Sequence, residues 1–333
     1  MRSENLMRVL AHAAFAASIV TVLAMGMAPA PAAAQSDYPT RPIRIVVGFG
    51  PGGGTDILAR LVGAKLSQIL GQSVVIENRP GAAARLAGEY AAHQPADGYT
   101  LLAAPVGPMS IAAAIFPDLK YSPTKSFVPL AMIGQFPEIL VVRPDTPVDS
   151  VKQLVAYAKQ HPDQANYPST SPAFTIPMEE LKLASGMPGV MIPYKSSGEM
   201  VLSVIEGQSM MALIDPPPTL PQVKAGKLKA LAVSGNERLA ELPNVPSMAE
   251  AGYPSVDMHL WSGMFAPIGT PAAVVAKLEK ALAQAIHDPG VEAKLKALAV
   301  GPGVATSEEF THQIESETVK FKAVIKAANL HFR

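Results

Sequence analysis

The chain of 333 residues contains no cysteine, few aromatic residues and no excess of charge of either sign. Without cysteine, no disulfide stabilises the fold and no thiol can act as a nucleophile or a metal ligand. Lys+Arg and Asp+Glu number 27 each, which excludes a strongly basic surface for nucleic acid or an anionic membrane. Any preference for an anionic ligand must therefore come from a local arrangement of groups.

Signals of catalysis are also missing. The seven histidines are scattered without a His-x-x-x-His pair, and the sequence has no Gly-x-Ser-x-Gly motif. A metal site and a hydrolase site of a known pattern both lack support. We therefore expect a protein that is not an enzyme and that needs no metal and no cofactor.

The N-terminal residues have the pattern of a secretory signal peptide. Arg2 and Arg8 precede an apolar stretch from Ala13 to Met25, and the small residues Ala32 to Ala34 follow it. The apolar stretch is shorter than the roughly 20 residues that span a bilayer, which argues against the alternative of a membrane anchor. We predict cleavage near Ala34 and a mature protein of residues 35–333 in the periplasm.

A glycine-rich segment is the strongest local motif. Ile43 to Val47 read as a strand, Gly48 to Asp56 as a turn, and Ile57 to Leu70 as a helix. The first N–H groups of a helix are unpaired and carry partial positive charge, so the pattern predicts an anion-binding site in this turn. Thr55 can donate to the anion from its N–H and hydroxyl while Asp56 caps the helix.

The same segment allows a second interpretation. Gly48, Gly50 and Gly53 match the spacing of the dinucleotide-binding fingerprint, and Glu77 ends the next strand, where that fold places its ribose-binding carboxylate. Pro51 argues against this interpretation because it removes an N–H from the loop that would hold pyrophosphate. A dinucleotide-dependent oxidoreductase therefore stays a distant alternative.

The order of predicted strands and helices indicates two α/β units. The pattern alternates strand and helix up to Ala103, which predicts a parallel sheet, and a second unit after Arg143 repeats the layout. Helices at Pro271 to His287 and Ser307 to Ala328 are expected to rejoin the first unit. We predict domain 1 from residues 35–139 and 264–333 and domain 2 from residues 140–263, with crossings near 138–143 and 259–266 that permit hinge closure over a cleft.

Two further segments are candidates for lining that cleft. Asp215 ends an apolar strand and precedes three prolines, so it is either a turn residue or an acceptor for a ligand ammonium, hydroxyl or water. Ser169, Thr170 and Ser171 precede a predicted helix near Met178 and would form a second anion-binding turn that faces the first. Trp261, in the second crossing, is a possible pocket residue.

Across nearly the whole mature region the chain resembles the Bug-type solute receptors of tripartite tricarboxylate transporters. The resemblance rests on colinear segments, among them Tyr38-Pro39-Thr40-Arg41-Pro42-Ile43-Arg44, Gly52-Gly53-Gly54-Thr55-Asp56, Glu77-Asn78-Arg79-Pro80-Gly81-Ala82, Pro95-Ala96-Asp97-Gly98-Tyr99-Thr100, Lys224-Ala225-Gly226-Lys227-Leu228 and Leu242-Pro243-Asn244-Val245-Pro246. It implies a periplasmic binding protein of the two-domain, type II-like Venus-flytrap fold, which closes over a small carboxylate and delivers it to integral-membrane transporter subunits.

The resemblance also implies which residues bind. The first carboxylate contacts fall on Phe49, Gly50, Gly52, Gly53, Thr55 and Asp56, and the acidic residue of the second unit falls on Asp215. The turn after the third strand is unusual for the family, since Val106 lies between prolines and makes that wall apolar. Around Ser169 to Ser171 the family's glycine-rich turn is replaced by three prolines and Phe174. We therefore expect a monocarboxylate with an apolar or aromatic body.

Two expectations concern partners. We expect a monomer that binds a small organic acid and no nucleic acid. The alternative from a different class is an orphan or sensory periplasmic binding protein that signals to a membrane partner.

Overall fold

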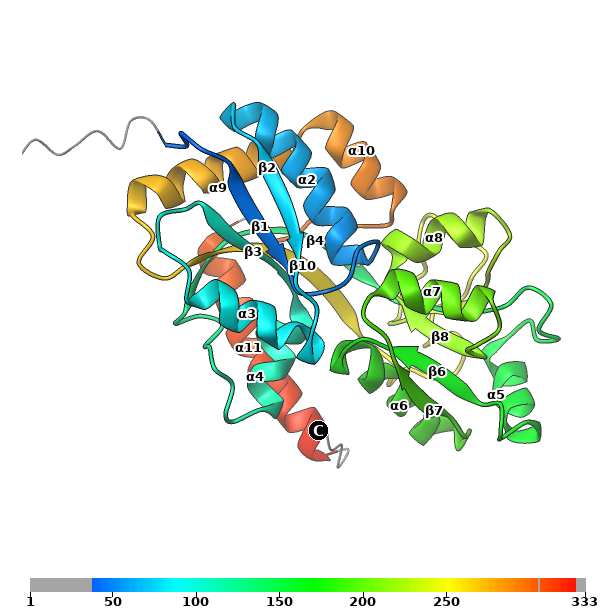
Figure 1. Ribbon diagram of the computed structural model, residues 1–333. Helices are drawn as coiled ribbons and strands as arrows, with labels where there is room; N and C mark the ends of the chain where they lie inside the picture. Colours follow the sequence, from blue (N-terminus) through cyan, green and yellow to red (C-terminus); the bar gives the residue numbers. More distant parts are fainter. Residues whose placement is uncertain (1–37, 305, 328–333) are drawn as a thin grey trace, which may run out of the picture. The chain divides into compact units, whose positions relative to one another are not determined.

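The computed structural model describes residues 38–304 and 306–327 (Figure 1). The predicted signal peptide and its cleavage site lie outside the described residues. The residues from Pro39 onward form one compact unit, so the division into two domains stays a prediction. Among the described helices, none combines the length and the hydrophobicity that crossing a membrane requires.

The first group of strands forms a five-stranded sheet in the order β2-β1-β3-β10-β4. Its strands are β1 (Ile43–Val47), β2 (Val74–Asn78), β3 (Thr100–Pro105), β4 (Phe127–Pro137) and β10 (His259–Pro267). The expected parallel pairing holds for β1 with β2 and β3, whereas β10 runs antiparallel to both β3 and β4. The sheet is therefore mixed: the parallel pairing predicted for the strands up to Ala103 is confirmed, and β10 adds antiparallel pairs.

Strand β4 was not predicted because Pro129, Gly134 and Pro137 interrupt its apolar pattern. In the sheet, its partner β10 shifts register between Ser262 and Gly263 and again between Met264 and Phe265. Such bulges absorb residues that a regular ladder would exclude. Residues that normally signal a break are thus part of the longest strand.

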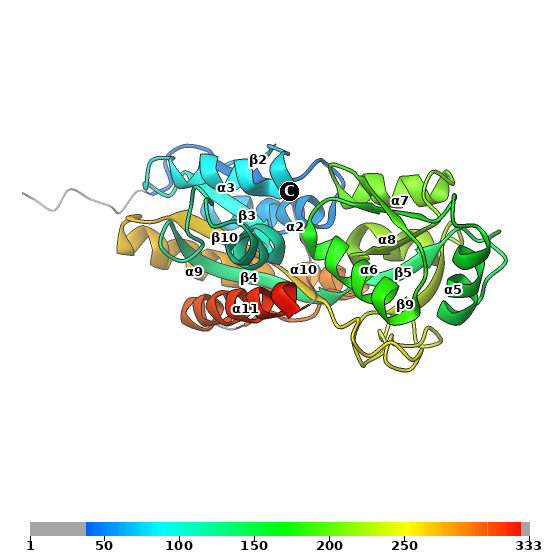
Figure 2. The same cartoon turned by 90° about the horizontal axis from the view of Figure 1, so that it is seen from below.

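Helices from the N-terminal and the C-terminal parts of the sequence surround this sheet. They are α2 (Gly54–Leu70), α3 (Arg85–Ala92), α4 (Ala112–Ile115), α9 (Ala272–Ile286), α10 (Pro289–Ala297) and α11 (Ser307–Ala327), with the short helical segments η2 (Ala82–Ala84) and η3 (Gly107–Ile111). Helix α9 packs on α2, and α11 lies along β4 (Figure 2). The C-terminal helices therefore rejoin the first sheet, as predicted.

The second group of elements does not repeat the first, which corrects the predicted repeat. A three-stranded antiparallel sheet has the order β8-β5-β9, and β6 and β7 form a separate parallel pair. The elements are β5 (Ile139–Val142), α5 (Val151–Gln160), β6 (Asn166–Ser169), α6 (Pro172–Ser185), β7 (Val190–Pro193), α7 (Ser197–Ile205), β8 (Met211–Ile214), α8 (Pro216–Lys224) and β9 (Lys229–Val233). Sequence order alone does not reveal strand direction, because each connection was long enough for either pairing.

Prolines start two helices where the sequence suggested turns. Helix α8 begins at Pro216 directly after Asp215, and α6 begins at Pro172 directly after Ser171. Proline suits the first helical position because the N–H it lacks would be unpaired there. Both helix N-termini consequently lie at the ends of strands, close to the candidate site.

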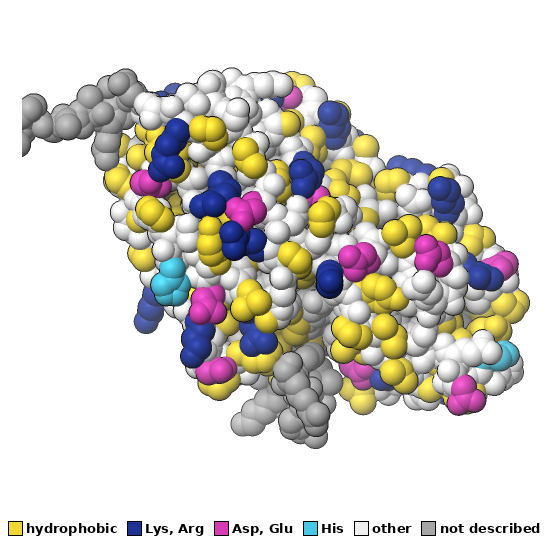
Figure 3. All heavy atoms as spheres, viewed as in Figure 1, with side chains coloured by type: hydrophobic (Ala, Val, Ile, Leu, Met, Phe, Trp, Pro, Cys, Tyr) yellow, Lys and Arg dark blue, Asp and Glu magenta, His cyan; other side chains and the backbone are white. Residues whose placement is uncertain are grey.

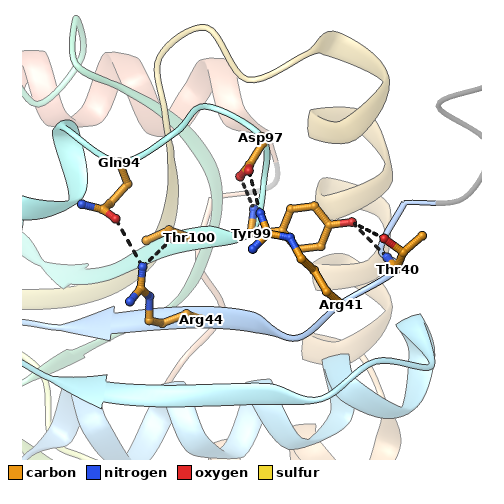
Figure 4. A network of polar contacts seen from close by, with 7 residues as sticks. All are labelled: Thr40, Arg41, Arg44, Gln94, Asp97, Tyr99 and Thr100. Carbon is orange, nitrogen blue, oxygen red and sulfur yellow. Dashed lines mark hydrogen bonds and ion pairs between the residues drawn. The ribbon is translucent and has the colours of Figure 1, made fainter. Parts of the chain in front are cut away.

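A network of polar contacts covers the amino ends of β1 and β3 (Figure 4). Arg41 forms an ion pair with Asp97 at 2.8 Å and stacks over the ring of Tyr99, whose hydroxyl accepts from the Thr40 N–H at 2.9 Å. Arg44 donates to Gln94 and Thr100, both at 3.2 Å. This network fastens the start of the described chain to the sheet end opposite the glycine-rich turn.

Candidate functional site

The glycine-rich turn leads into α2 earlier than predicted. The helix starts at Gly54 rather than Ile57, and Gly53 is its N-cap, without any side-chain hydrogen bond to the helix. Among the described residues, no hydrogen-bond partner is found for the N–H groups of Thr55 and Asp56. The start of α2 therefore keeps two free donors and the partial positive charge of the helix.

Asp56 does not cap α2 in the predicted way, because it is the third helical residue. Its carboxylate accepts from the Gly52 N–H at 3.0 Å, from Asn78 Nδ2 at 2.8 Å and from Arg60 Nε at 2.9 Å. Burial raises the pKa of Asp56, but hydrogen bonds from Arg60, Gly52 and Asn78 outweigh it, so the pKa is lowered. The side chain is fully engaged in holding the turn and is not available to a ligand.

The glycines of the turn serve close packing against α7. The Gly50 N–H donates to the Lys195 carbonyl at 2.9 Å, and the Gly54 N–H donates to Ser197 Oγ at 3.1 Å. A Cβ on Gly198 would lie 2.7 Å from the Gly52 carbonyl oxygen. The turn and the N-terminus of α7 therefore approach backbone to backbone, which residues with side chains would prevent.

Asp215 lies at the start of α2, where the sequence predicted the bound anion. A Cβ on Gly54 would be only 1.7 Å from Asp215 Oδ2, so this carboxylate oxygen lies directly against the glycine. Burial raises the pKa of Asp215 to about 6, although Ser197 and the Gly54 N–H act in the opposite direction. Its other oxygen, Oδ1, is buried without a hydrogen-bond partner.

These groups surround an inner cavity of about 30 Å³. Its lining comes from strand ends and helix starts and is mostly apolar: Phe49, Gly53, Gly54, Thr55, Pro105, Val106, Phe136, Thr170, Ser171, Ala173, Phe174, Ser197, Asp215 and Leu260. The volume suffices for about two water molecules. An organic acid can enter only if the turn after β1 and the groups facing it move apart.

A larger outer cavity of about 720 Å³ shares Phe49, Thr170 and Ser171 with the inner one. Arg85 and Lys195 also line it, so cationic side chains lie in its wall. Its size falls in the range of cavities that hold small molecules. The two cavities together offer a narrow, mostly apolar inner end with a few polar groups and a wider outer part.

The site is not part of an extended charged surface. Lys and Arg are interspersed with Asp and Glu on the face of the molecule drawn in Figure 3. Backbone N–H groups, and not a long-range field, would therefore have to attract an anion to the inner cavity.

The structure brings together most of the residues predicted from the sequence. Seven line the inner cavity: Phe49, Gly53, Thr55, Val106, Thr170, Ser171 and Asp215. Ser169 lines only the outer cavity, while Gly50, Gly52 and Asp56 line neither. Their N–H and carboxylate groups are used in the contacts of the turn described above.

In the turn after β6, the predicted second anion site, hydroxyls bond within the turn. Ser169 Oγ donates to the Ser171 carbonyl at 2.9 Å and lies 2.8 Å from Thr175 Oγ1. Thr170 Oγ1 instead is buried without a partner and lines the inner cavity. Thr170 is thus the hydroxyl of this turn that a ligand can engage.

Several lining residues escaped the sequence analysis. Ser197 is one, because only the docking of α7 on the glycine-rich turn reveals it; its signal was the N-cap pattern of Ser196 followed by Glu199, whose N–H donates to Ser196 Oγ. Phe136 and Leu260 are others, since they lie on β4 and β10 beside the predicted crossings. Neighbouring strands place them against the inner cavity.

Trp261 is a core residue and not a pocket residue, which corrects the earlier possibility. It is 1% exposed and packs against Phe265 and Phe310, with ring centroids 6.4 and 4.9 Å away. Its indole N–H donates to Glu317 at 2.8 Å. The aromatic cluster joins β10 to α11.

The alternative functions gain no support from the geometry. In the part of the chain that the structure describes, no three His, Cys, Asp or Glu residues are arranged to hold a metal ion. Glu77, the proposed ribose ligand of a dinucleotide site, is ion-paired to Arg44 at 3.3 Å and to Arg79 at 2.5 Å. The carboxylate that a nucleotide would need is therefore already neutralised.

Comparison with known proteins identifies the class. The profile of the tripartite tricarboxylate transporter family receptor matches residues 58–330. The chain therefore belongs to this family of transporter receptors, as the sequence motifs indicated.

Individual relatives agree with this assignment. The chain is 32% identical to the protein BugT of Bordetella pertussis over 89% of its length and 92% of that protein. It is similar to R. palustris Rpa4515, solved with adipate (32% identity, TM-score 0.84, 88% of this chain and 99% of that one). It is also similar to MatC from Rhodopseudomonas palustris, solved with bound malate (30% identity, TM-score 0.82, 86% and 100%).

Proposed function

We propose that this receptor captures a small organic carboxylate in the joined inner and outer cavities, in the periplasm, and delivers it to integral-membrane transporter subunits. The observation that carries the proposal is the free N–H group of Thr55, which lines the inner cavity at the start of α2. A helix start of this kind binds carboxylates without a cationic side chain. Relatives solved with adipate and malate support an organic acid as the ligand.

Capture requires opening and closing of the site. The inner cavity is too small for an organic acid, so the contacts of Gly50 with Lys195 and of Gly54 with Ser197 must separate on entry. When these contacts form again after the ligand has entered, they would exclude water and so strengthen the hydrogen bonds of the ligand. The protein then acts as a binding receptor and not as an enzyme.

The apolar lining favours a monocarboxylate with an apolar or aromatic body. Phe136, Phe174 and Leu260 line the inner cavity, and they offer no hydrogen bonds to a second carboxylate there. A citrate-sized ligand would leave its additional charges unpaired at this wall. This preference stays a prediction, as do the monomeric state and cleavage near Ala34.

Thermal unfolding of residues 35–333 with mono-, di- and tricarboxylates tests the function. A bound acid at a hundredfold excess over its Kd should stabilise the protein by about 2.7 kcal/mol. Thr55→Val, which removes a hydroxyl at the cavity, should weaken binding about tenfold. Thr219→Val is the matched control, because Thr219 Oγ1 is buried without a partner but does not line the cavity. Stabilisation by NAD and by no acid would overturn the proposal.

A further inference from the structure

Two carboxylates lie side by side at the end of the three-stranded sheet. Glu138 directly precedes β5 and Asp215 directly follows β8. Because Ile139 pairs with Ile214 in the antiparallel ladder, Glu138 and Asp215 occupy the next cross-strand position. They are 0% and 4% exposed. Like charges directly opposite each other destabilise a sheet, so this pair is a cost to the fold.

Three oxygens of this pair have no hydrogen-bond partner. They are Glu138 Oε1, Glu138 Oε2 and Asp215 Oδ1. Among the described residues, no Lys or Arg forms an ion pair with either carboxylate. Burial, followed by repulsion from Asp215 and Glu180, raises the pKa of Glu138 well above its usual value. A buried carboxylate is ordinarily paired, so the pair lacks a positively charged partner.

Asp215 is the member of the pair that reaches the inner cavity. Thr170 lines the same cavity with a buried, unpartnered hydroxyl and supplies a second acceptor. Asp215 Oδ2 lies against Gly54, one residue before the free N–H of Thr55. Acceptors for a cation and donors for an anion are therefore adjacent in one small space.

We propose that Asp215 binds an ammonium group of the ligand while the start of α2 binds its carboxylate. The ligand is then a small amino acid with an apolar side chain. This inference rests on the proposed function and specifies its substrate class. An ammonium group brings three N–H donors and a positive charge to the buried acceptors Asp215 and Thr170, whereas a hydroxyl brings one donor and no charge.

The surroundings fit the rest of such a ligand. Phe174, Phe136 and Leu260 offer apolar surface beside Asp215, and the outer cavity leaves room for a side chain. Glu138 does not line either cavity, so it is a positioning residue that acts on the ligand only through Asp215, beside which it is buried. The ammonium contact itself belongs to Asp215.

Matched ligand pairs test the inference on the protein of residues 35–333. Calorimetry at pH 7.5 compares leucine with 4-methylpentanoate and phenylalanine with 3-phenylpropionate, which differ only in the amino group. We expect the amino acid of at least one pair to bind at least tenfold more tightly than its partner. Acids without the amino group that bind equally or better would overturn the inference and leave the carboxylate receptor intact. If no acid binds, with or without an amino group, both proposals fail.

Substitutions test which residue causes the preference for the amino acid over its matched acid. Asp215→Asn should reduce the ratio of the two dissociation constants to below about threefold, and Glu138→Gln should reduce it less. Glu206→Gln removes one exposed negative charge outside both cavities and should leave the ratio unchanged. A ratio that Asp215→Asn does not alter would overturn the role of Asp215. If that variant does not fold, the matched pairs measured on the unaltered protein decide the question.

Discussion

Polar groups at the two ends of the five-stranded sheet differ in whether they have hydrogen-bond or ion-pair partners. At the amino ends of β1 and β3, Arg41, Asp97 and Arg44 find hydrogen-bond or ion-pair partners although they are partly exposed to water. Next to the carboxyl ends, Asp215 and Thr170, which follow β8 and β6, keep unpartnered oxygens although they are buried. An unpaired buried polar group costs far more than an exposed one, and a ligand in the inner cavity could complete this second arrangement.

Backbone strain follows the same division. Ala82, Ala83 and Ala84 all have positive φ values, of 47°, 53° and 70°, and they lie in the wall of the outer cavity after β2. Residues with a Cβ are disfavoured in this region of conformational space. Unfavourable conformations and unpaired groups thus gather at the binding end, while the opposite end contributes ordinary surface stability.

The largest effect is expected from Glu138→Gln on the pH dependence of stability. The pKa of Glu138 is raised in the folded chain, so the folded state holds this proton over a pH range in which the unfolded state has lost it. Stability therefore falls as pH rises above the unfolded value, by up to about 1.4 kcal/mol per pH unit. The free energy of unfolding, measured in urea at pH 5, 6, 7 and 8, should fall with pH in the wild type and fall less steeply in Glu138→Gln. Parallel curves for variant and wild type would contradict it.

Gly54→Ala should damage the binding end next most strongly. The backbone of Gly54 has no positive φ, so helix α2 accepts alanine, but the added Cβ would lie 1.7 Å from Asp215 Oδ2. Such overpacking costs about 1–3 kcal/mol, which should weaken ligand binding about 5- to 150-fold. Calorimetry with an acid found in the thermal screen measures the loss.

Gly189→Ala is the matched control for this change, because Gly189 lines neither cavity. A Cβ at Gly189 meets the Lys182 side chain at 3.4 Å, which is ordinary contact. Its affinity should stay within about threefold of wild type. If both variants bind alike, the close approach of Asp215 to Gly54 does not matter for binding.

Ala83→Gly should stabilise the protein by about 1 kcal/mol, because glycine adopts the left-handed conformation without a steric penalty. Ala92→Gly at the end of α3 should instead destabilise it by about 0.5–1 kcal/mol, since alanine favours the helix. Chemical unfolding compares the two changes. If Ala83→Gly destabilises the protein as Ala92→Gly does, the left-handed conformation of Ala83 carries no energetic penalty.

The smallest effect is expected at the opposite end of the sheet. Asp97→Asn weakens an ion pair whose Arg41 side chain is 60% exposed, so it should cost below about 1 kcal/mol. Ligand affinity should be unchanged, because the change lies at the far ends of β1 and β3. A large loss of affinity in this variant would show that the two ends are coupled.

Much of the fold and of the site was predictable from local sequence. Strand β1 has the predicted bounds, and the glycine-rich turn, Thr55, Thr170 and Asp215 do lie around one cavity. Strand β4 and helix α8 were missed because proline usually signals a break, yet here it occupies a bulge and a first helical position. Ser197 and Phe136 could not be assigned because no local pattern announces which surface another segment will cover.

The sequence by itself determined the family, the glycine-rich turn and the helix that leaves free N–H groups behind it, because these depend on residues adjacent along the chain. Only the tertiary structure decided that Asp215 occupies the space against Gly54 and that Glu138 lies beside it. Those contacts join segments about 160 and 80 residues apart, and strand pairing and burial set them. Packing thus placed a buried carboxylate beside the helix start whose free N–H groups favour an anion.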